Sequence, residues 1–181
     1  MNRLETETSL GKVVFNVTPR SERPVVLFIH GFSRQPKHLA AWRGRLTRAD
    51  VWFAHLPGHG APELAVLSLE AWRQAFEEAT HQMFAEREVT VVGESLGAMI
   101  ALSLPASRIV AVEPFLEARW PIQVSLRMMG DRLDPRYRTA FFSQPHHEVV
   151  STIRSPTLVL AGATLMGEPR SMPRPPSVLT E

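Results

Sequence analysis

The fold is decided by residues 89–102, whose sequence is VTVVGESLGAMIAL. A β-branched run enters a Gly-x-Ser-x-Gly pattern and is followed by small and apolar helix formers, which predicts a strand, a sharp turn and a helix. Gly93 and Gly97 flank Ser95 because a turn this tight brings backbone segments together and leaves no room for a Cβ. Such a turn exposes a serine hydroxyl at the end of a sheet, with the following backbone N–H groups free to bind an anion.

The composition of the chain narrows the classes of protein it can be. Its 181 residues suit one domain over residues 1–181, and 44% hydrophobic residues exclude a disordered chain. A net charge of +2 is too small to indicate nucleic acid or a membrane surface as a partner. The absence of cysteine excludes disulfides and thiolate metal sites. With no apolar signal core at the N-terminus and no apolar run of membrane-spanning length, we expect a cytoplasmic protein.

Segments with strand and helix patterns alternate along the chain. Strands are predicted at residues 4–10 and 13–17, which form an antiparallel hairpin, and at 25–29, 50–54, 89–92, 108–112 and 156–162. Helices are predicted at residues 38–46, at 69–86 and after Ser95. This alternation predicts an α/β fold with a mostly parallel sheet and helices on both faces. The polar clusters follow the strands, so we expect them to gather at the carboxyl ends of the strands.

Two segments interrupt this regular pattern. Residues 114–153 are less periodic and contain four prolines, so we expect short helices that form a small lid. Residues 167–181 contain four prolines and are expected to form an irregular tail. His146 and His147 lie together in the lid, where a solvated loop is the expected environment.

The order of these features resembles the α/β-hydrolase family from about Lys12 to Gly162. The resemblance rests on three motifs that follow strands, His30-Gly31-Phe32, Leu56-Pro57-Gly58-His59-Gly60 and Gly93-Glu94-Ser95-Leu96-Gly97, and on a strand segment after the lid, Ser155-Pro156-Thr157-Leu158-Val159-Leu160-Ala161-Gly162. It implies that Ser95 is a nucleophile and that the backbone N–H groups of Phe32 and Leu96 form an oxyanion hole. A serine hydroxyl needs a base to take its proton, and two aimed N–H donors would stabilise the tetrahedral oxyanion.

The acid of the implied catalytic triad has two candidates. The family usually places it just past the strand that ends near Gly162, where Glu168 is the first acidic residue. Glu113, at the end of the preceding strand, is the alternative because some family members use that position. We further expect His30 and Glu94 to contribute to substrate binding, with His30 supporting the oxyanion loop by hydrogen bonding and Glu94 shaping the field beside Ser95.

The sequence departs from the family after residue 162. The family histidine follows a last strand, but no histidine lies beyond His147, and the chain reaches Glu181 before that strand could form. We therefore expect a shortened chain that lacks the last strand and helix of the fold. One edge of the sheet is then left uncovered, which makes an oligomer through that edge a further expectation.

Two functions remain in consideration. The first is a serine hydrolase that cleaves a small carboxylic ester or related acyl compound through an acyl-enzyme on Ser95. The alternative is a catalytically silent protein of the same fold that binds a small ligand or partner. Neither implies a metal or a cofactor.

Overall fold

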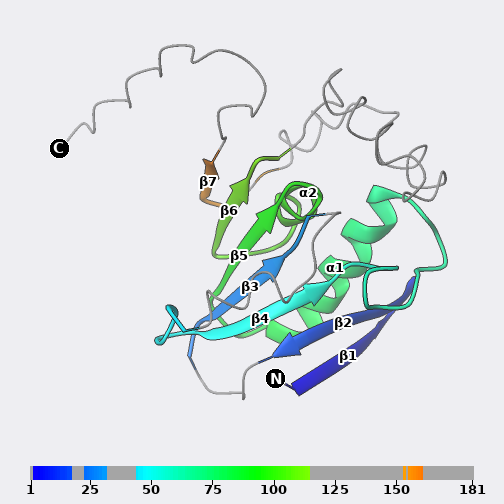
Figure 1. Cartoon of the computed structure of the whole chain (residues 1–181), viewed down its shortest axis with the longest axis horizontal. Helices are drawn as coiled ribbons and strands as arrows, with labels where there is room; N and C mark the ends of the chain where they lie inside the picture. The colour runs from blue at the N-terminus through cyan, green and yellow to red at the C-terminus, as the bar shows by residue number, and fades with distance from the viewer. Residues whose placement is uncertain (1, 18–22, 32–43, 115–152, 154, 161–181) are drawn as a thin grey trace, which may run out of the picture.

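A single mixed sheet organises the computed structural model, which describes residues 2–17, 23–31, 44–114, 153 and 155–160. In this part of the chain the strand order is β1-β2-β4-β3-β5-β6-β7 (Figure 1). The elements are β1 (Asn2–Thr8), β2 (Gly11–Val17), β3 (Val25–Ile29), β4 (Asp50–His55), α1 (Leu69–Phe84), β5 (Val89–Glu94), α2 (Leu96–Ala101), β6 (Arg108–Val112) and β7 (Thr157–Leu160). The predicted α/β class, with an N-terminal antiparallel hairpin and an otherwise mostly parallel sheet, is confirmed.

The main hydrophobic core lies between one face of the sheet and the helices α1 and α2 (Figure 1). Alternate strand residues such as Leu27, Trp52 and Val91 point into it. Trp52 packs edge-on against Phe84 of α1, with ring centroids 4.6 Å apart. The near-continuous apolar strands therefore bury their alternate side chains under the two described helices.

The opposite face of the sheet carries a smaller buried cluster. Phe28, Val51 and Phe53 form it, and the rings of Phe28 and Phe53 stack at 5.5 Å. Of the helix predicted at residues 38–46, residues 38–43 lie outside the described residues and residues 44–45 form a turn. Most of the lid at 114–153 and the whole tail at 167–181 also lie outside them. No helix among the described residues has the length and apolar character needed to cross a membrane.

The strand order determines which loops can meet. β3 lies between β4 and β5, and the chain proceeds from β3 to β4 on one side and from β5 to β6 on the other. In open α/β sheets, ligands bind at such a reversal, outside the carboxyl ends of the strands. The ends of β3 and β5, which carry His30-Gly31 and Glu94-Ser95, are therefore the place to look for a site.

Candidate active site

Ser95 has a backbone conformation that an L-amino acid rarely adopts. It lies between β5 and α2 with φ 52° and ψ −114°. Its N–H donates to the carbonyl oxygen of Val112 at 2.9 Å, and its carbonyl oxygen accepts from Ala98 and Met99 at 3.0 and 3.2 Å. These bonds to β6 and α2 hold a conformation that costs about 1–3 kcal/mol by itself. The half-buried side chain is thereby held at the carboxyl end of β5.

The two flanking glycines are required by backbone contacts. A Cβ on Gly93 would lie 2.4 Å from the carbonyl oxygen of Gly97 and 2.5 Å from the Cα of Ala98. A Cβ on Gly97 would lie 2.2 Å from the carbonyl oxygen of Ile29 in β3. Because all three neighbours are backbone atoms, they cannot move aside as a flexible side chain would. The tight packing that the Gly-x-Ser-x-Gly pattern indicated is present in the structure.

The end of β3 lies directly beside this turn. A Cβ on Gly31 would be 3.2 Å from both the carbonyl oxygen of Glu94 and the Cβ of Ser95. Phe32, the next residue, lies outside the described residues. Leu96 is fully buried at the start of α2, where its N–H has no acceptor within the helix, and no other described group accepts from it.

His30 is completely buried and bonds to the main chain on both sides of its ring. Its Nε2 accepts the N–H of Leu56 at 3.2 Å, so the ring proton is on Nδ1, which donates to the carbonyl oxygen of Gly31 at 2.8 Å. These bonds tie the loop after β3 to the loop after β4. They are consistent with the expected support of the loop, while contact of His30 with a substrate stays a prediction.

The last residue of β4 is a half-buried histidine, His55. Neither ring nitrogen of His55 has a hydrogen-bond partner with acceptable geometry, and a Cβ on Gly60 would lie 2.6 Å from its Nδ1. Burial lowers the pKa of His55 below its ordinary value; the nearby backbone of His59 opposes this shift, and the charge of Arg3 adds to it. His55 is therefore held neutral near physiological pH.

Of the two candidate acids, the structure describes only Glu113. This exposed residue follows β6 with φ 49°, and its N–H donates to the carbonyl oxygen of Leu160 at 2.7 Å. The preceding residue, Val112, accepts the hydrogen bond from Ser95. Glu113 thus directly follows the residue that bonds the Ser95 turn, Val112. Glu168 lies outside the described residues. Glu94 is half-buried and ends β5.

The described residues supply no histidine base beside the Ser95 hydroxyl. Within the described ranges, no histidine is hydrogen-bonded to the serine hydroxyl, and His146 and His147 lie outside these ranges. The same ranges contain no group of three or more histidine, aspartate or glutamate side chains able to hold a metal ion.

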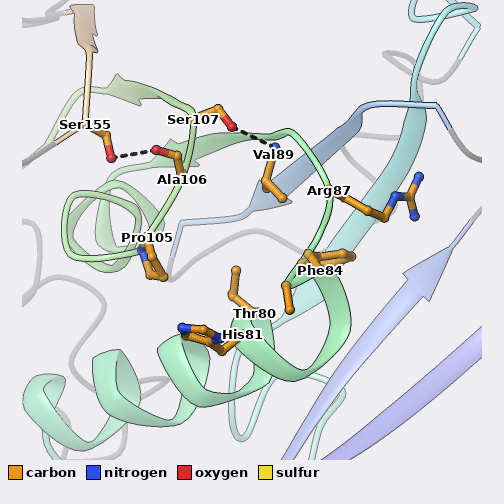
Figure 2. A pocket seen from close by; sticks show the side chains of 10 residues that line it. Thr80, His81, Phe84, Arg87, Val89, Pro105, Ala106, Ser107 and Ser155 are labelled. Atoms are coloured by element: carbon orange, nitrogen blue, oxygen red, sulfur yellow. Dashed lines mark hydrogen bonds between the residues drawn. The ribbon is translucent and has the colours of Figure 1, made fainter.

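An open hollow of about 380 Å³ lies away from Ser95 (Figure 2). It lies between the end of α1, the start of β5 and the loop before β6, with Thr80, Val89 and Pro105 in its wall. Val89 begins β5 and Ser95 follows its end, so six residues of strand, or about 20 Å, separate them. The hollow therefore lies at the amino-terminal end of β5, at the opposite end of this strand from Ser95, and is not part of the candidate active site.

Several contacts in the site were not predicted from the sequence. These are the approach of Gly31 to Ser95, the bond from Leu56 to His30, the buried ring nitrogens of His55 and the positive φ of Glu113. The His-Gly pair after β3 and the Pro-Gly-His-Gly run after β4 marked the loops as polar strand ends. Neither pattern indicates which loop contacts which, because that depends on the strand order.

The chain belongs to the alpha/beta hydrolase family, whose family model matches residues 26–179. No curated protein matches it. Among solved structures it is similar to an N-acyl homoserine lactonase, AidH, in complex with N-butanoyl homoserine, at 20% identity and a TM-score of 0.68 over 89% of this chain and 78% of that chain. It is also similar to the N-formylmaleamic acid deformylase Nfo from Pseudomonas putida, at 16% identity and a TM-score of 0.64 over 88% and 81%. A thermophilic esterase from Thermogutta terrifontis aligns at 17% identity and a TM-score of 0.56 over 89% and 80%. At these identities the likeness shows a shared fold.

Proposed function

We propose that the chain is a serine hydrolase that cleaves a small carboxylic ester or related acyl compound through an acyl-enzyme on Ser95. The observation that carries this proposal is the conformation of Ser95, φ 52° and ψ −114° at the junction of β5 and α2. A serine held in such a strained strand-to-helix turn is typical of a nucleophile elbow, in which the hydroxyl stands clear of the sheet. The strain supports a functional role because backbone strain of this kind clusters at active sites and ligand-binding sites.

The proposed reaction uses the groups gathered around this turn. The Ser95 Oγ attacks the carbonyl carbon while its proton passes to a base, and the negative charge develops on the carbonyl oxygen. The N–H groups of Leu96 and Phe32 bind that oxyanion, each contributing about 3 kcal/mol. The alcohol leaves with the proton from the base, and water then attacks the acyl-enzyme to release the acid and restore Ser95.

Two further observations support an acyl substrate. The N–H of Leu96 has no acceptor among the described residues, which leaves it available to a ligand oxygen. Two of the similar structures are described as an N-acyl homoserine lactonase and an esterase, both of which act on esters. The proposal extends this reaction class to the present chain and leaves the acyl group open.

One observation favours a second candidate, a catalytically silent protein that binds a small ligand at the same turn. No described histidine is hydrogen-bonded to the Ser95 hydroxyl, and the proposed attack needs a base there. Under this alternative the chain would retain a small ester or acid without cleaving it.

Labelling with a fluorophosphonate probe separates the two candidates. The hydrolase proposal predicts that the folded chain takes one label at Ser95 and hydrolyses short p-nitrophenyl esters. Ser95→Ala is expected to abolish labelling and lower ester turnover by about 10³-fold or more, because the nucleophile is gone. Ser103→Ala, which changes a serine after the end of α2, is the matched control and is expected to keep both.

The same experiment can also contradict the hydrolase proposal. If the folded wild-type chain takes no label and its ester turnover equals that of Ser95→Ala, the hydrolase proposal is wrong. Retention of a short-chain ester by that unlabelled chain, measured by calorimetry, would then support the silent binding protein.

A further inference from the structure

The peptide group that joins Val112 to Glu113 is hydrogen-bonded on both sides. It lies at the end of β6, which runs between β5 and β7 (Figure 1). The carbonyl oxygen of Val112 accepts from the N–H of Ser95 at 2.9 Å, and the N–H of Glu113 donates to the carbonyl oxygen of Leu160 at 2.7 Å. Because this peptide group is trans and planar, the two bonds leave one rigid plane in opposite directions. A single peptide group therefore connects the backbone of Ser95 to β7.

Glu113 adopts an unfavourable backbone conformation at this junction. Its φ is 49°, and among the described residues only Glu113 and Ser95 combine a side chain with a positive φ. Crowding between the Cβ and the backbone makes this region costly for any L-residue other than glycine. Pro114 adds to the cost, because a proline pushes the residue before it toward extended conformations. The local sequence thus opposes the conformation that Glu113 adopts.

Main-chain bonds, rather than side-chain packing, maintain this conformation. Glu113 is exposed, so no close packing around its side chain fixes the value of φ. With the neighbouring chain in place, relaxation of φ to negative values would turn the 112–113 peptide plane and carry the Val112 oxygen away from Ser95. Backbone strain of this kind persists only where the surroundings over-determine it. The strain at Glu113 and the strain at Ser95 are therefore coupled through one peptide group.

We propose that Glu113 is a positioning residue, whose positive-φ backbone holds the amide of Ser95 in place through the Val112 carbonyl group. This role belongs to the main chain and is separate from the acid role considered for the Glu113 carboxylate. Its consequence for catalysis rests on the proposed hydrolase function, in which Ser95 is the nucleophile. A residue that tolerates a positive φ at position 113 keeps the turn intact, and a residue that resists it loosens the turn.

Two variants that both lack the carboxylate isolate the backbone effect. Glu113→Gly adopts a positive φ freely, whereas Glu113→Val places a β-branched side chain where a positive φ is a severe outlier. The first readout is the NMR scalar coupling across the hydrogen bond from the Ser95 amide nitrogen to the Val112 carbonyl carbon. We expect the coupling to persist in the wild type and in Glu113→Gly and to be lost in Glu113→Val.

The second readout is the rate at which a fluorophosphonate probe labels Ser95. Labelling requires the intact turn, so its rate follows the population of that conformation. We expect Glu113→Val to be labelled about tenfold more slowly than Glu113→Gly, which corresponds to the cost of a positive φ for a residue with a side chain. Glu113→Ala, which adds a single methyl group, is expected to lie between the two and replaces Glu113→Val if that variant does not fold.

Two controls separate the turn from the stability of the whole chain. The coupling from the Asp50 amide to the Pro24 carbonyl group, a 2.9 Å bond between β4 and the residue before β3, should be the same in every variant. Glu88 is exposed and precedes β5 without a positive φ. Glu88→Gly and Glu88→Val therefore make the same two substitutions where no strain exists, and we expect equal labelling rates for them.

Three outcomes would overturn the positioning role. The first is an equal Ser95 coupling in Glu113→Gly and Glu113→Val. The second is loss of the Asp50 coupling together with the Ser95 coupling, which would show a damaged fold rather than a loosened turn. The third is loss of the Ser95 coupling with no slower labelling of an active chain. If the wild type itself takes no label, the hydrolase proposal fails, and the Ser95 coupling in the two variants still decides whether Glu113 holds the turn.

Discussion

Ser95 combines a strained backbone with a complete set of main-chain hydrogen bonds. Its N–H bonds Val112 and its carbonyl oxygen is shared by Ala98 and Met99, so relaxing φ from 52° would break contacts to both β6 and α2. Strain of this kind persists only where the surroundings over-determine it. The backbone conformation of Ser95 is therefore held in place by its neighbours on β6 and α2.

Adding a methyl group at either flanking glycine is expected to destabilise the fold. Gly93→Ala and Gly97→Ala place a Cβ within 2.4 and 2.2 Å of backbone oxygens and should each lower the free energy of unfolding by at least about 2 kcal/mol. Gly97 lies in α2, where alanine propensity alone would stabilise the helix by about 1 kcal/mol, so a loss there identifies the contact with β3 as the cause.

Gly44→Ala is the matched control for this prediction. Its Cβ would meet nothing within 4 Å, so the change should stay within about 0.5 kcal/mol. Urea denaturation measures all three variants, and equal stability of Gly97→Ala and Gly44→Ala would contradict the packing described for the turn.

His55 should make the stability of the chain fall with acid. Its folded-state pKa is lowered from 6.5 mainly by burial, so below about pH 6.5 the unfolded chain binds a proton that the folded chain binds only at lower pH. The free energy of unfolding should therefore be highest above this range and decline as pH falls, with a slope from this residue of at most about 1.4 kcal/mol per pH unit.

The variant His55→Leu isolates this contribution. Leucine cannot titrate and fills a site where the ring nitrogens have no bonding partner. Urea denaturation at about pH 7.5, 6.5 and 5.5 should show a shallower decline for the variant than for the wild type. Identical slopes would mean that His55 is not responsible for the acid sensitivity.

At the scale of elements, three neighbouring strand ends build the site. β3 ends at His30-Gly31, β5 ends at Glu94-Ser95, and β6 ends at Val112-Glu113. Because β3, β5 and β6 are adjacent and parallel, residues from three distant segments lie side by side at the carboxyl ends of these strands. The helices α1 and α2 contribute mainly by packing against one face of the sheet and so covering the hydrophobic core.

The choice of acid is a choice between the ends of two strands. If the acid follows β6, Glu113→Gln should lower ester turnover by about 10²-fold or more while Glu168→Gln leaves it near wild type, because only a carboxylate stabilises the histidine cation. We favour this result, since Glu113 adjoins the residue that bonds Ser95. Turnover of short p-nitrophenyl esters by both variants measures it, and the reverse ranking would assign the acid to Glu168.

At the scale of the whole molecule, the sheet has two unlike edges and two unlike faces. α1 and α2 cover the larger core, while Phe28, Val51 and Phe53 form the smaller cluster on the other face. The β1 edge carries ion-paired charged side chains, whereas the described residues of β7 are mostly apolar. The hollow near Val89 and the candidate active site near Ser95 lie at opposite ends of β5.

Local sequence patterns were enough to predict most elements and their order. The apolar run at 25–29 forms β3, the β-branched run at 108–112 forms β6, and the periodic segment at 69–86 forms a helix that ends two residues earlier, at Phe84. These signals are local because strand and helix periodicity depends on neighbouring residues. The Gly-x-Ser-x-Gly pattern is only partly local, because Gly93 packs against Gly97 and Ala98 within the turn, whereas Gly97 packs against Ile29 of β3.

The sequence by itself therefore determined the class of fold, the family and the position of the serine that we propose as the nucleophile. Only the tertiary structure decided that Gly31 lies close to Ser95, that His30 is bonded to Leu56, and that the ring nitrogens of half-buried His55 have no hydrogen-bond partner. Each of these contacts joins segments that lie far apart in the chain or depends on how the loops pack. They follow from β3 lying between β4 and β5, an order set by the burial of whole faces that no single stretch of residues encodes.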